Sequence, residues 1–138
     1  MANKLTDEVR SHLIGLATDA REQAYTPYSN YKVGAALLTS SGRYYTGCNI
    51  ENAAYPDSIC AERVAVFKAV SDGQSELLAI AVVTSNGGTP CGSCRQVLAE
   101  FGLETMVIIA DITGQVRQEA KLKDLLPGAF TPVDLKRR

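Results

Sequence analysis

The sequence has little histidine and no strong excess of charge of either sign. Its 138 residues include 14 Lys and Arg against 15 Asp and Glu, which leaves a net charge of −1 at pH 7. Without a broadly positive surface, binding to nucleic acid is not expected. The one basic run, residues 136–138, is expected to be a solvated tail. The single histidine, His12, is expected on the surface of the first helix, far in sequence from other metal ligands.

Long apolar segments are also missing. No stretch approaches the length needed to cross a membrane, and residues 1–8 lack the apolar core of a signal peptide. We therefore expect a cytoplasmic protein that makes no membrane contact. Thiols stay reduced in that compartment, so the clustered cysteines among the four are expected to bind metal or take part in catalysis rather than form disulfides.

Linkers, internal repeats and low-complexity tracts are absent as well. Hydrophobic residues make up 46% of the chain and charged residues 21%, as in an ordinary globular protein. A chain of 138 residues is long enough to bury a core without disulfides. Residues 1–138 are therefore expected to form a single domain.

Apolar periodicity predicts helices alternating with strands. Helices are expected over residues 7–23, 59–70 and 91–101, with Thr6 as the N-cap of the first and a single helical turn over 122–126. Strands are expected over residues 31–39, 44–50, 77–84, 105–111 and, more weakly, 116–120. This order predicts an α/β fold, a three-layer α/β/α sandwich around a mixed, roughly five-stranded sheet.

Two cysteine clusters, 31 residues apart, are the most informative feature that is present: Cys60-Ala61-Glu62-Arg63 and Pro90-Cys91-Gly92-Ser93-Cys94. Three thiols suit a catalytic zinc site, which keeps one coordination position open. At i, i+3 on a helix, Cys91 and Cys94 share one face, and Cys60 begins another helix. The positive end of a helix dipole favours thiolates. One Zn²⁺ per chain, bound by Cys60, Cys91 and Cys94, is therefore expected, since thiolates favour zinc.

Glu62 is predicted to move protons rather than bind the metal. It lies two residues from Cys60, and positions i and i+2 of a helix do not face the same way. It can reach the open position instead, take a proton from water there and return it to the substrate. Arg63 is expected to donate hydrogen bonds to the sulfurs and offset their charge, and Gln96 to help similarly. Together these residues predict hydrolytic attack on an electron-poor sp² carbon.

A structural zinc site closed by Cys48 is the alternative for the same cysteines. Structural sites favour two CxxC-type pairs, and this chain has one. Cys48 is instead expected to pack as a small strand residue.

The Cys-Ala-Glu triplet followed by Pro-Cys-x-x-Cys resembles the zinc-dependent cytidine deaminases. Nearly the whole chain resembles the small, homotetrameric class that serves free-nucleoside salvage, through Tyr28-Ser29, Val33-Gly34-Ala35-Ala36, Gly47-Cys48-Asn49-Ile50-Glu51-Asn52-Ala53 and the segment 125–130. The resemblance implies hydrolytic deamination of cytidine and 2′-deoxycytidine to the uridines, with release of ammonia.

The resemblance also implies how a nucleoside is held. Asn49 and Glu51 would hold the ribose 3′-hydroxyl, and two residues apart on a strand their side chains would share one face. The backbone N–H of Ala61 and the carbonyl of Thr89 would read the O2 atom and the exocyclic amine of the pyrimidine. Tyr31 stands where the family commonly has phenylalanine packed on the base, and its hydroxyl needs a partner or water.

Phe130 matches the aromatic residue that reaches into a neighbouring subunit's site in the homotetramer. Alternatively, it anchors the C-terminal tail onto its own core.

For the whole chain, three other functions stay open: a deaminase of another cytosine nucleoside such as blasticidin S, a polynucleotide-editing deaminase, and a non-catalytic zinc-stabilised domain. The editing function is disfavoured because basic and aromatic tracks for a strand are missing.

Overall fold

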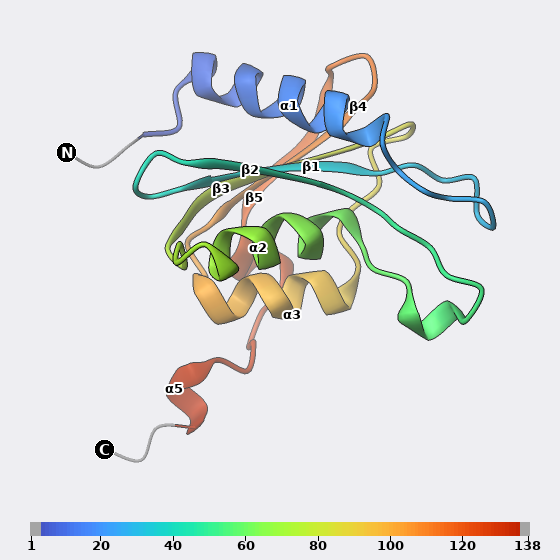
Figure 1. Ribbon diagram of the computed structural model, residues 1–138. Helices are drawn as coiled ribbons and strands as arrows, with labels where there is room; N and C mark the ends of the chain where they lie inside the picture. The colour runs from blue at the N-terminus through green and yellow to red at the C-terminus, as the bar shows by residue number, and fades with distance from the viewer. Residues whose placement is uncertain (1–3, 136–138) are drawn as a thin grey trace.

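Five strands form one mixed sheet in the computed structural model, which describes residues 4–135 (Figure 1). The strands are β1 (Gly34–Thr39), β2 (Tyr44–Cys48), β3 (Leu77–Thr84), β4 (Met106–Asp111) and β5 (Val116–Lys121). Their spatial order is β2-β1-β3-β4-β5, and only the β3–β4 pair is parallel. The predicted mixed five-stranded sheet is confirmed.

Helices cover both faces of this sheet. Helix α1 (Asp7–Arg21) lies on one face, and α2 (Ala61–Ser71) and α3 (Gly92–Phe101) lie on the other (Figure 1). Alternate residues of a strand point to opposite faces, so β1 feeds both layers of the core. Leu37 packs in the cluster with α2 and α3, whereas Leu38 packs in the cluster with α1. The predicted three-layer α/β/α sandwich is confirmed.

Helix α1 begins as the sequence predicts and ends earlier. The Thr6 hydroxyl accepts a hydrogen bond from the backbone N–H of Val9 at 3.2 Å, so the N-cap is confirmed. The helix ends at Arg21, two residues before the predicted end. His12 is exposed, as expected, and its ring makes a T-shaped contact with the Tyr44 ring at a centroid distance of 4.9 Å.

The hairpin strands are shorter than predicted. Strand β1 begins at Gly34 rather than at residue 31, and β2 ends at Cys48 rather than at residue 50. The reason is the side chain of Asn49, which accepts from the N–H of Val33 and donates to the carbonyl of Tyr31. The side-chain oxygen takes the Val33 N–H in place of the Asn49 carbonyl, which accepts from Tyr25 instead, so only the Asn49 N–H still bonds Val33 and regular pairing stops here.

A glycine allows α2 to lie directly on β2. An added Cβ at Gly47 would stand 2.4 Å from the carbonyl oxygen of Ala61 and 2.7 Å from the backbone nitrogen of Ala65. Both are backbone atoms that cannot swing aside. The first turn of α2, which follows Cys60, is therefore seated against the sheet through backbone contact.

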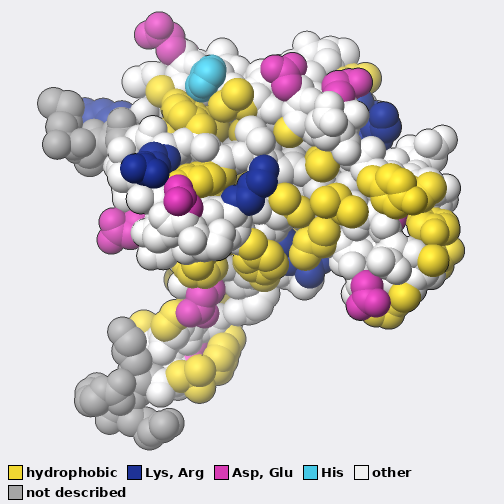
Figure 2. All heavy atoms as spheres, viewed as in Figure 1, with side chains coloured by type: hydrophobic (Ala, Val, Ile, Leu, Met, Phe, Trp, Pro, Cys, Tyr) yellow, Lys and Arg dark blue, Asp and Glu magenta, His cyan; other side chains and the backbone are white. Residues whose placement is uncertain are grey.

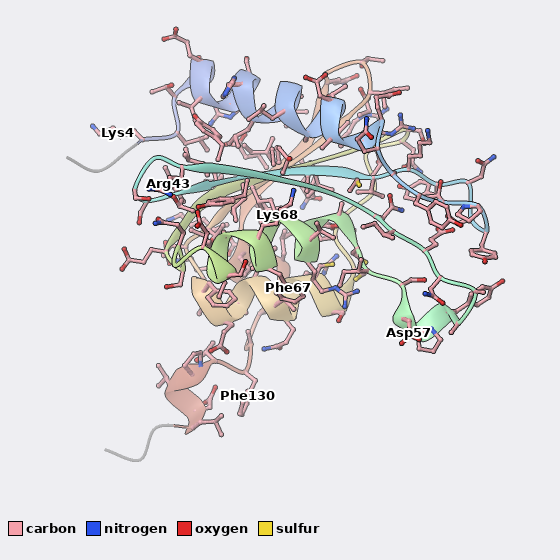
Figure 3. All side chains as sticks on the ribbon, in the orientation of Figure 1. Lys4, Arg43, Asp57, Phe67, Lys68 and Phe130 are labelled. Carbon is pink, nitrogen blue, oxygen red and sulfur yellow. The ribbon has the colours of Figure 1, made fainter. Side chains whose placement is uncertain are left out.

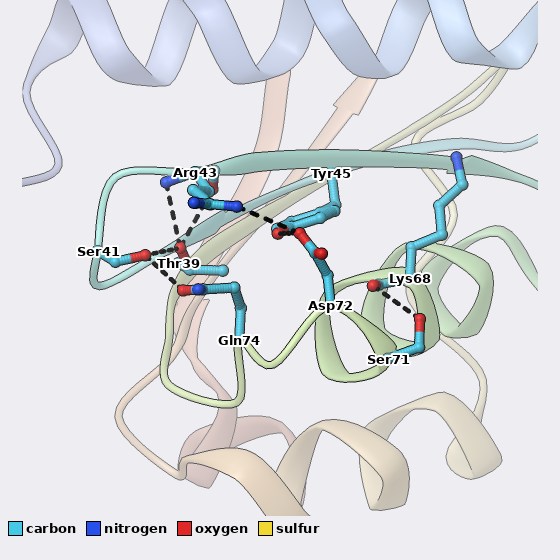
Figure 4. Close-up of polar contacts among 8 residues, drawn as sticks. All are labelled: Thr39, Ser41, Arg43, Tyr45, Lys68, Ser71, Asp72 and Gln74. Carbon is cyan, nitrogen blue, oxygen red and sulfur yellow. Dashed lines mark hydrogen bonds and ion pairs between the residues drawn. The ribbon is translucent and has the colours of Figure 1, made fainter.

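Polar contacts fix the other end of α2 to the same hairpin (Figure 4). Arg43 and Tyr45 both bond the carboxylate of Asp72, the residue after the helix, at 3.3 and 2.5 Å. The Lys68 ammonium donates to the carbonyl of Thr46 at 2.7 Å. Helix α2 is thus held at both ends, which limits movement of the residues at its N-terminus.

Two short helical segments were not predicted, η1 (Tyr55–Asp57) and α5 (Pro132–Leu135). Each has a proline in its first turn, where the missing N–H costs nothing, although proline in sequence suggests a helix breaker. After α4 (Leu122–Leu125), the chain leaves the body as an arm that ends in α5 (Figure 1). Within residues 4–135, none of the helices combines the length and apolarity that a membrane crossing requires.

Candidate active site

The three cysteines of the two clusters meet where α2 and α3 begin, at the right of Figure 1. Cys60 is the N-cap of α2, Cys91 is the N-cap of α3, and Cys94 lies in the first turn of α3. Their sulfurs lie within 4.8 Å of one another, with Cys60–Cys91 at 3.8 Å and Cys91–Cys94 at 3.5 Å. Neither N-cap thiol forms a capping hydrogen bond with its own helix, so the sulfurs remain available to an ion.

This donor set fits zinc with one coordination position open. Among residues 4–135, no fourth His, Cys, Asp or Glu joins the three thiols as a ligand. Cys48 stays outside the group, and the four cysteines form no disulfide. Three thiolates on two helix N-termini match the three-ligand pattern of catalytic zinc rather than the four-ligand pattern of structural zinc.

A cation lies beside the sulfurs. Arg63 donates from Nη2 to the Cys60 sulfur at 3.3 Å, the contact that the sequence predicts. The pKa of Cys60 is lowered to about 5, first by its hydrogen bond with Cys94 and then by Arg63. The pKa of Cys94 is raised, because that thiol keeps its proton to bond the Cys60 thiolate and is buried. Cys60 is therefore more acidic than Cys94, and its sulfur is the one that accepts from Arg63.

Glu62 is a buried carboxyl group beside this cluster. It stands in the first turn of α2 with 4% of its surface exposed, and it lines the cavity next to Cys60. Burial raises its pKa to about 7. A carboxyl group in this setting can both hold and release a proton near neutral pH, which proton transfer in catalysis requires.

A cavity of about 250 Å³ brings most of the predicted residues together. Its lining comprises Ser29, Tyr31, Val33, Asn49, Glu51, Cys60, Ala61, Glu62, Val82, Thr84, Gly88, Thr89 and Cys91. Ala61 is the first residue of α2, so its N–H has no partner within the helix and is available to a ligand. The cavity thus places two of the three cysteines, the buried carboxyl group and several polar groups around one space, whereas Cys94 is buried behind its wall.

Asn49 and Glu51 both line this cavity, but not for the reason given by the sequence. They follow β2 in an irregular segment, and only Ile50 between them makes isolated bridges, to Tyr25 and Ile59. Glu51 accepts from the N–H groups of Tyr28 and Ser29 at 3.0 and 3.1 Å and also from the Ser29 hydroxyl. The Ser29 hydroxyl is the main reason that the pKa of Glu51 is lowered.

Ser29 and Arg95 are two residues of the site to which the sequence assigned no role. Arg95 donates to the carbonyl of Pro90, to the hydroxyl of Thr89 and to the carbonyl of Leu125 at 2.8, 3.2 and 2.9 Å. It therefore fixes the segment that enters α3. The position of Arg95 directly after the CxxC pair was the one local signal of a role in the site. Its contact with Leu125, 30 residues away, could not be read from the sequence.

Gln96 and Phe130 lie away from the cavity. The Gln96 amide nitrogen donates to the backbone carbonyl of Phe130 at 2.8 Å, so it holds the C-terminal arm rather than a sulfur. The Phe130 side chain is 56% exposed and projects from the arm (Figure 3). Its neighbour Ala129 packs against the core in its place. Hydrophobic side chains gather on this arm (Figure 2), including Val133 and Leu135.

Comparisons with known proteins agree with this geometry. Residues 7–110 match the family described as the cytidine and deoxycytidylate deaminase zinc-binding region. A cytidine deaminase of Sporosarcina psychrophila is 52% identical over 126 residues, covering 89% of this chain and 92% of that protein. One from Halalkalibacterium halodurans is 50% identical over 129 residues, covering 91% and 97%. The crystal structure of cytidine deaminase from Burkholderia pseudomallei superposes with a TM-score of 0.83 at 46% identity, covering 91% of this chain and all of that one.

Proposed function

Because the chain belongs to the cytidine and deoxycytidylate deaminase family, we propose that it converts cytidine and 2′-deoxycytidine to uridine and 2′-deoxyuridine with release of ammonia. The observation that carries this proposal is the buried Glu62 carboxyl group, which lines one cavity together with Cys60 and Cys91, two of the three clustered thiols. Hydrolysis of an amine at an sp² carbon needs an activated water and a group that moves its protons.

Cys60, Cys91 and Cys94 hold one zinc ion per chain. Zinc supplies Lewis acidity at that position, which makes a water molecule nucleophilic near neutral pH. Arg63 bonds the Cys60 sulfur and offsets part of the charge of the three thiolates. The bound ion would thus keep enough Lewis acidity for this chemistry.

Glu62 carries the protons. It takes the first proton from the attacking water and delivers it to N3 of the pyrimidine as the C4–O bond forms. It then takes the second proton from the new C4 hydroxyl and delivers it to the exocyclic nitrogen, and ammonia leaves as the C4–N bond breaks. One water is consumed, and the ring keeps the proton on N3. Burial of Glu62 excludes bulk water from these transfers.

The cavity walls supply groups that fit a nucleoside. Asn49 and Glu51 hold the ribose 3′-hydroxyl, and Tyr31 packs on the base. The first N–H of α2, at Ala61, reads O2, and the carbonyl of Thr89 reads the exocyclic amine. All five residues line the same space, which supports these roles. Residues 1–138 then act as a single catalytic domain.

The enzyme works as a homotetramer in the cytoplasm, with each site completed by neighbouring subunits. Three large side chains of the C-terminal arm are more than half exposed, Phe130 at 56%, Val133 at 74% and Leu135 at 63%. Apolar groups of this size favour burial against a partner. Phe130 reaches a neighbouring subunit's site, and reduced cysteines suit the cytoplasm. Light scattering on the purified protein tests for a mass of four chains.

An ultraviolet assay of cytidine conversion, with zinc measured on the same sample, tests the activity. We expect Glu62→Gln to keep the fold and one zinc per chain and to lose at least about 100-fold in turnover. Glu104→Gln, which alters an exposed carboxylate, serves as the matched control. A wild-type sample with one zinc per chain and no turnover overturns the proposal. Far faster turnover of blasticidin S than of cytidine makes that compound the substrate instead.

A further inference from the structure

The hydroxyl of Tyr31 joins two walls of the cavity. It donates to the side-chain oxygen Oδ1 of Asn86 at 2.7 Å, across 55 positions of sequence. Tyr31 belongs to the segment before β1, whereas Asn86 lies in the loop between β3 and α3. Asn86 does not line the cavity itself, so it holds the phenol from outside.

This contact continues into a connected network. The Thr84 hydroxyl donates to the same Asn86 oxygen at 3.2 Å, and the N–H of Gly88 donates to the Thr84 hydroxyl at 2.9 Å. We call these four residues, Tyr31, Thr84, Asn86 and Gly88, the clasp. Its last member lies immediately before Thr89, the residue expected to read the exocyclic amine.

Gly88 is matched to the tyrosine hydroxyl in particular. An added Cβ would lie 2.6 Å from that hydroxyl oxygen, but 3.5 Å from Asn86 Oδ1 and 3.9 Å from Cζ of the Tyr31 ring. The two longer distances are ordinary contacts, whereas the first is a collision. Alanine at position 88 would thus force this one oxygen atom to move, and phenylalanine at position 31 would lack it.

We propose that the clasp is a positioning device, which fixes the 84–89 loop and thereby sets the affinity for a pyrimidine that carries an exocyclic amine. The inference deepens the proposed function and rests on it. The loop contains adjacent glycines, Gly87 and Gly88, so it has much conformational freedom to lose on binding. A loop already ordered by three hydrogen bonds loses less, which strengthens substrate binding without changing the chemical step.

Single substitutions test the effect on affinity. We expect Tyr31→Phe and Asn86→Leu each to raise KM for cytidine about three- to tenfold while kcat stays within about twofold. In the double variant, KM should rise no further than in the single variant with the higher KM, because both substitutions break the same hydrogen bond. Asn86→Asp keeps a side-chain oxygen as the acceptor, so its KM should be close to that of the wild type. Tyr44→Phe removes a tyrosine hydroxyl far from the cavity and should leave KM unchanged. Unchanged KM in both single variants, or additive losses in the double, overturns the proposal.

A thermal unfolding cycle at position 88 provides a readout that does not depend on activity. We expect Gly88→Ala to lower Tm in the wild-type background and to cost clearly less when Tyr31→Phe is present. Gly15→Ala, where an added Cβ meets nothing within 4 Å, is the matched control and has the same effect in both backgrounds. An equal decrease in Tm on Gly88→Ala in the two backgrounds would overturn the clasp.

The two failures are therefore separable. Turnover of cytidine by the wild type, with no coupling in the unfolding cycle, refutes the clasp and leaves the proposed function intact. Coupling in the cycle without turnover of cytidine supports the clasp as a structural element and refutes its role in cytidine binding together with the proposed function.

Discussion

Arg63 donates to the Cys60 sulfur at 3.3 Å, and its Nε atom is buried without a hydrogen-bond partner among residues 4–135. The guanidinium is therefore positioned to donate to the sulfur, although its own Nε–H is left without an acceptor. We expect Arg63→Gln to lower zinc affinity or turnover about 10–100-fold, because the thiolates lose a donor and a neighbouring positive charge.

Metal analysis after dialysis against a graded chelator, together with the cytidine assay, measures both quantities. Arg10→Gln is the control, since Arg10 pairs with Glu119 and lies away from the cysteines. Wild-type values of both quantities in Arg63→Gln would show that the contact does not affect the metal.

Gly47→Ala is expected to displace the N-terminus of α2. The added Cβ would stand 2.4 Å from the Ala61 carbonyl oxygen, and the cost of such overpacking is about 1–3 kcal/mol. Because Cys60 precedes Ala61, zinc affinity should fall together with the free energy of unfolding. Urea unfolding and metal analysis check this, with Gly15→Ala as the glycine control. A stable variant with full zinc affinity would contradict the rigid seating of α2.

Arg95→Met is expected to loosen the segment that enters α3. The variant keeps a long side chain but leaves the Pro90 and Leu125 carbonyls without their charged donor, at a cost of about 1–3 kcal/mol. KM for cytidine should rise, since Thr89 also loses a partner. Arg43→Met removes an exposed arginine as the control. If unfolding and KM both match the control, Arg95 does not position this segment.

The pH dependence of stability should report on Asp111, at the turn between β4 and β5. Hydrogen bonds from Thr113 and from Arg117 lower its pKa from 3.8 to about 2. A carboxylate whose pKa is lowered by folding stabilises the protein above its unfolded pKa, and the contribution is lost as pH falls toward the folded value. The difference in unfolding free energy between wild type and Asp111→Asn should therefore be constant from pH 8 to about 5 and shrink between about pH 4 and 2. A difference that does not change with pH would assign the effect to packing.

The zinc ligands were predictable because their spacing and their place at helix starts are local properties of the sequence. The roles of Asn49 and Glu51 rest on the resemblance, because both residues lie beyond the end of β2 and not on a strand as expected. Asn86 could not be identified, since Asn-Gly in sequence indicates a turn. Its contact with Tyr31 exists only after β1 and β3 have paired.

The distance in sequence between the zinc ligands affects the order of events in folding. Cys60 and Cys91 are 31 residues apart, and β3 lies between them in the chain. Their sulfurs meet only when β3 has paired with β1, a non-local contact that forms slowly. A metal ion that needs all three sulfurs would accordingly bind late, after the rate-limiting step of folding. Loading with zinc should then slow unfolding and leave the folding rate almost unchanged.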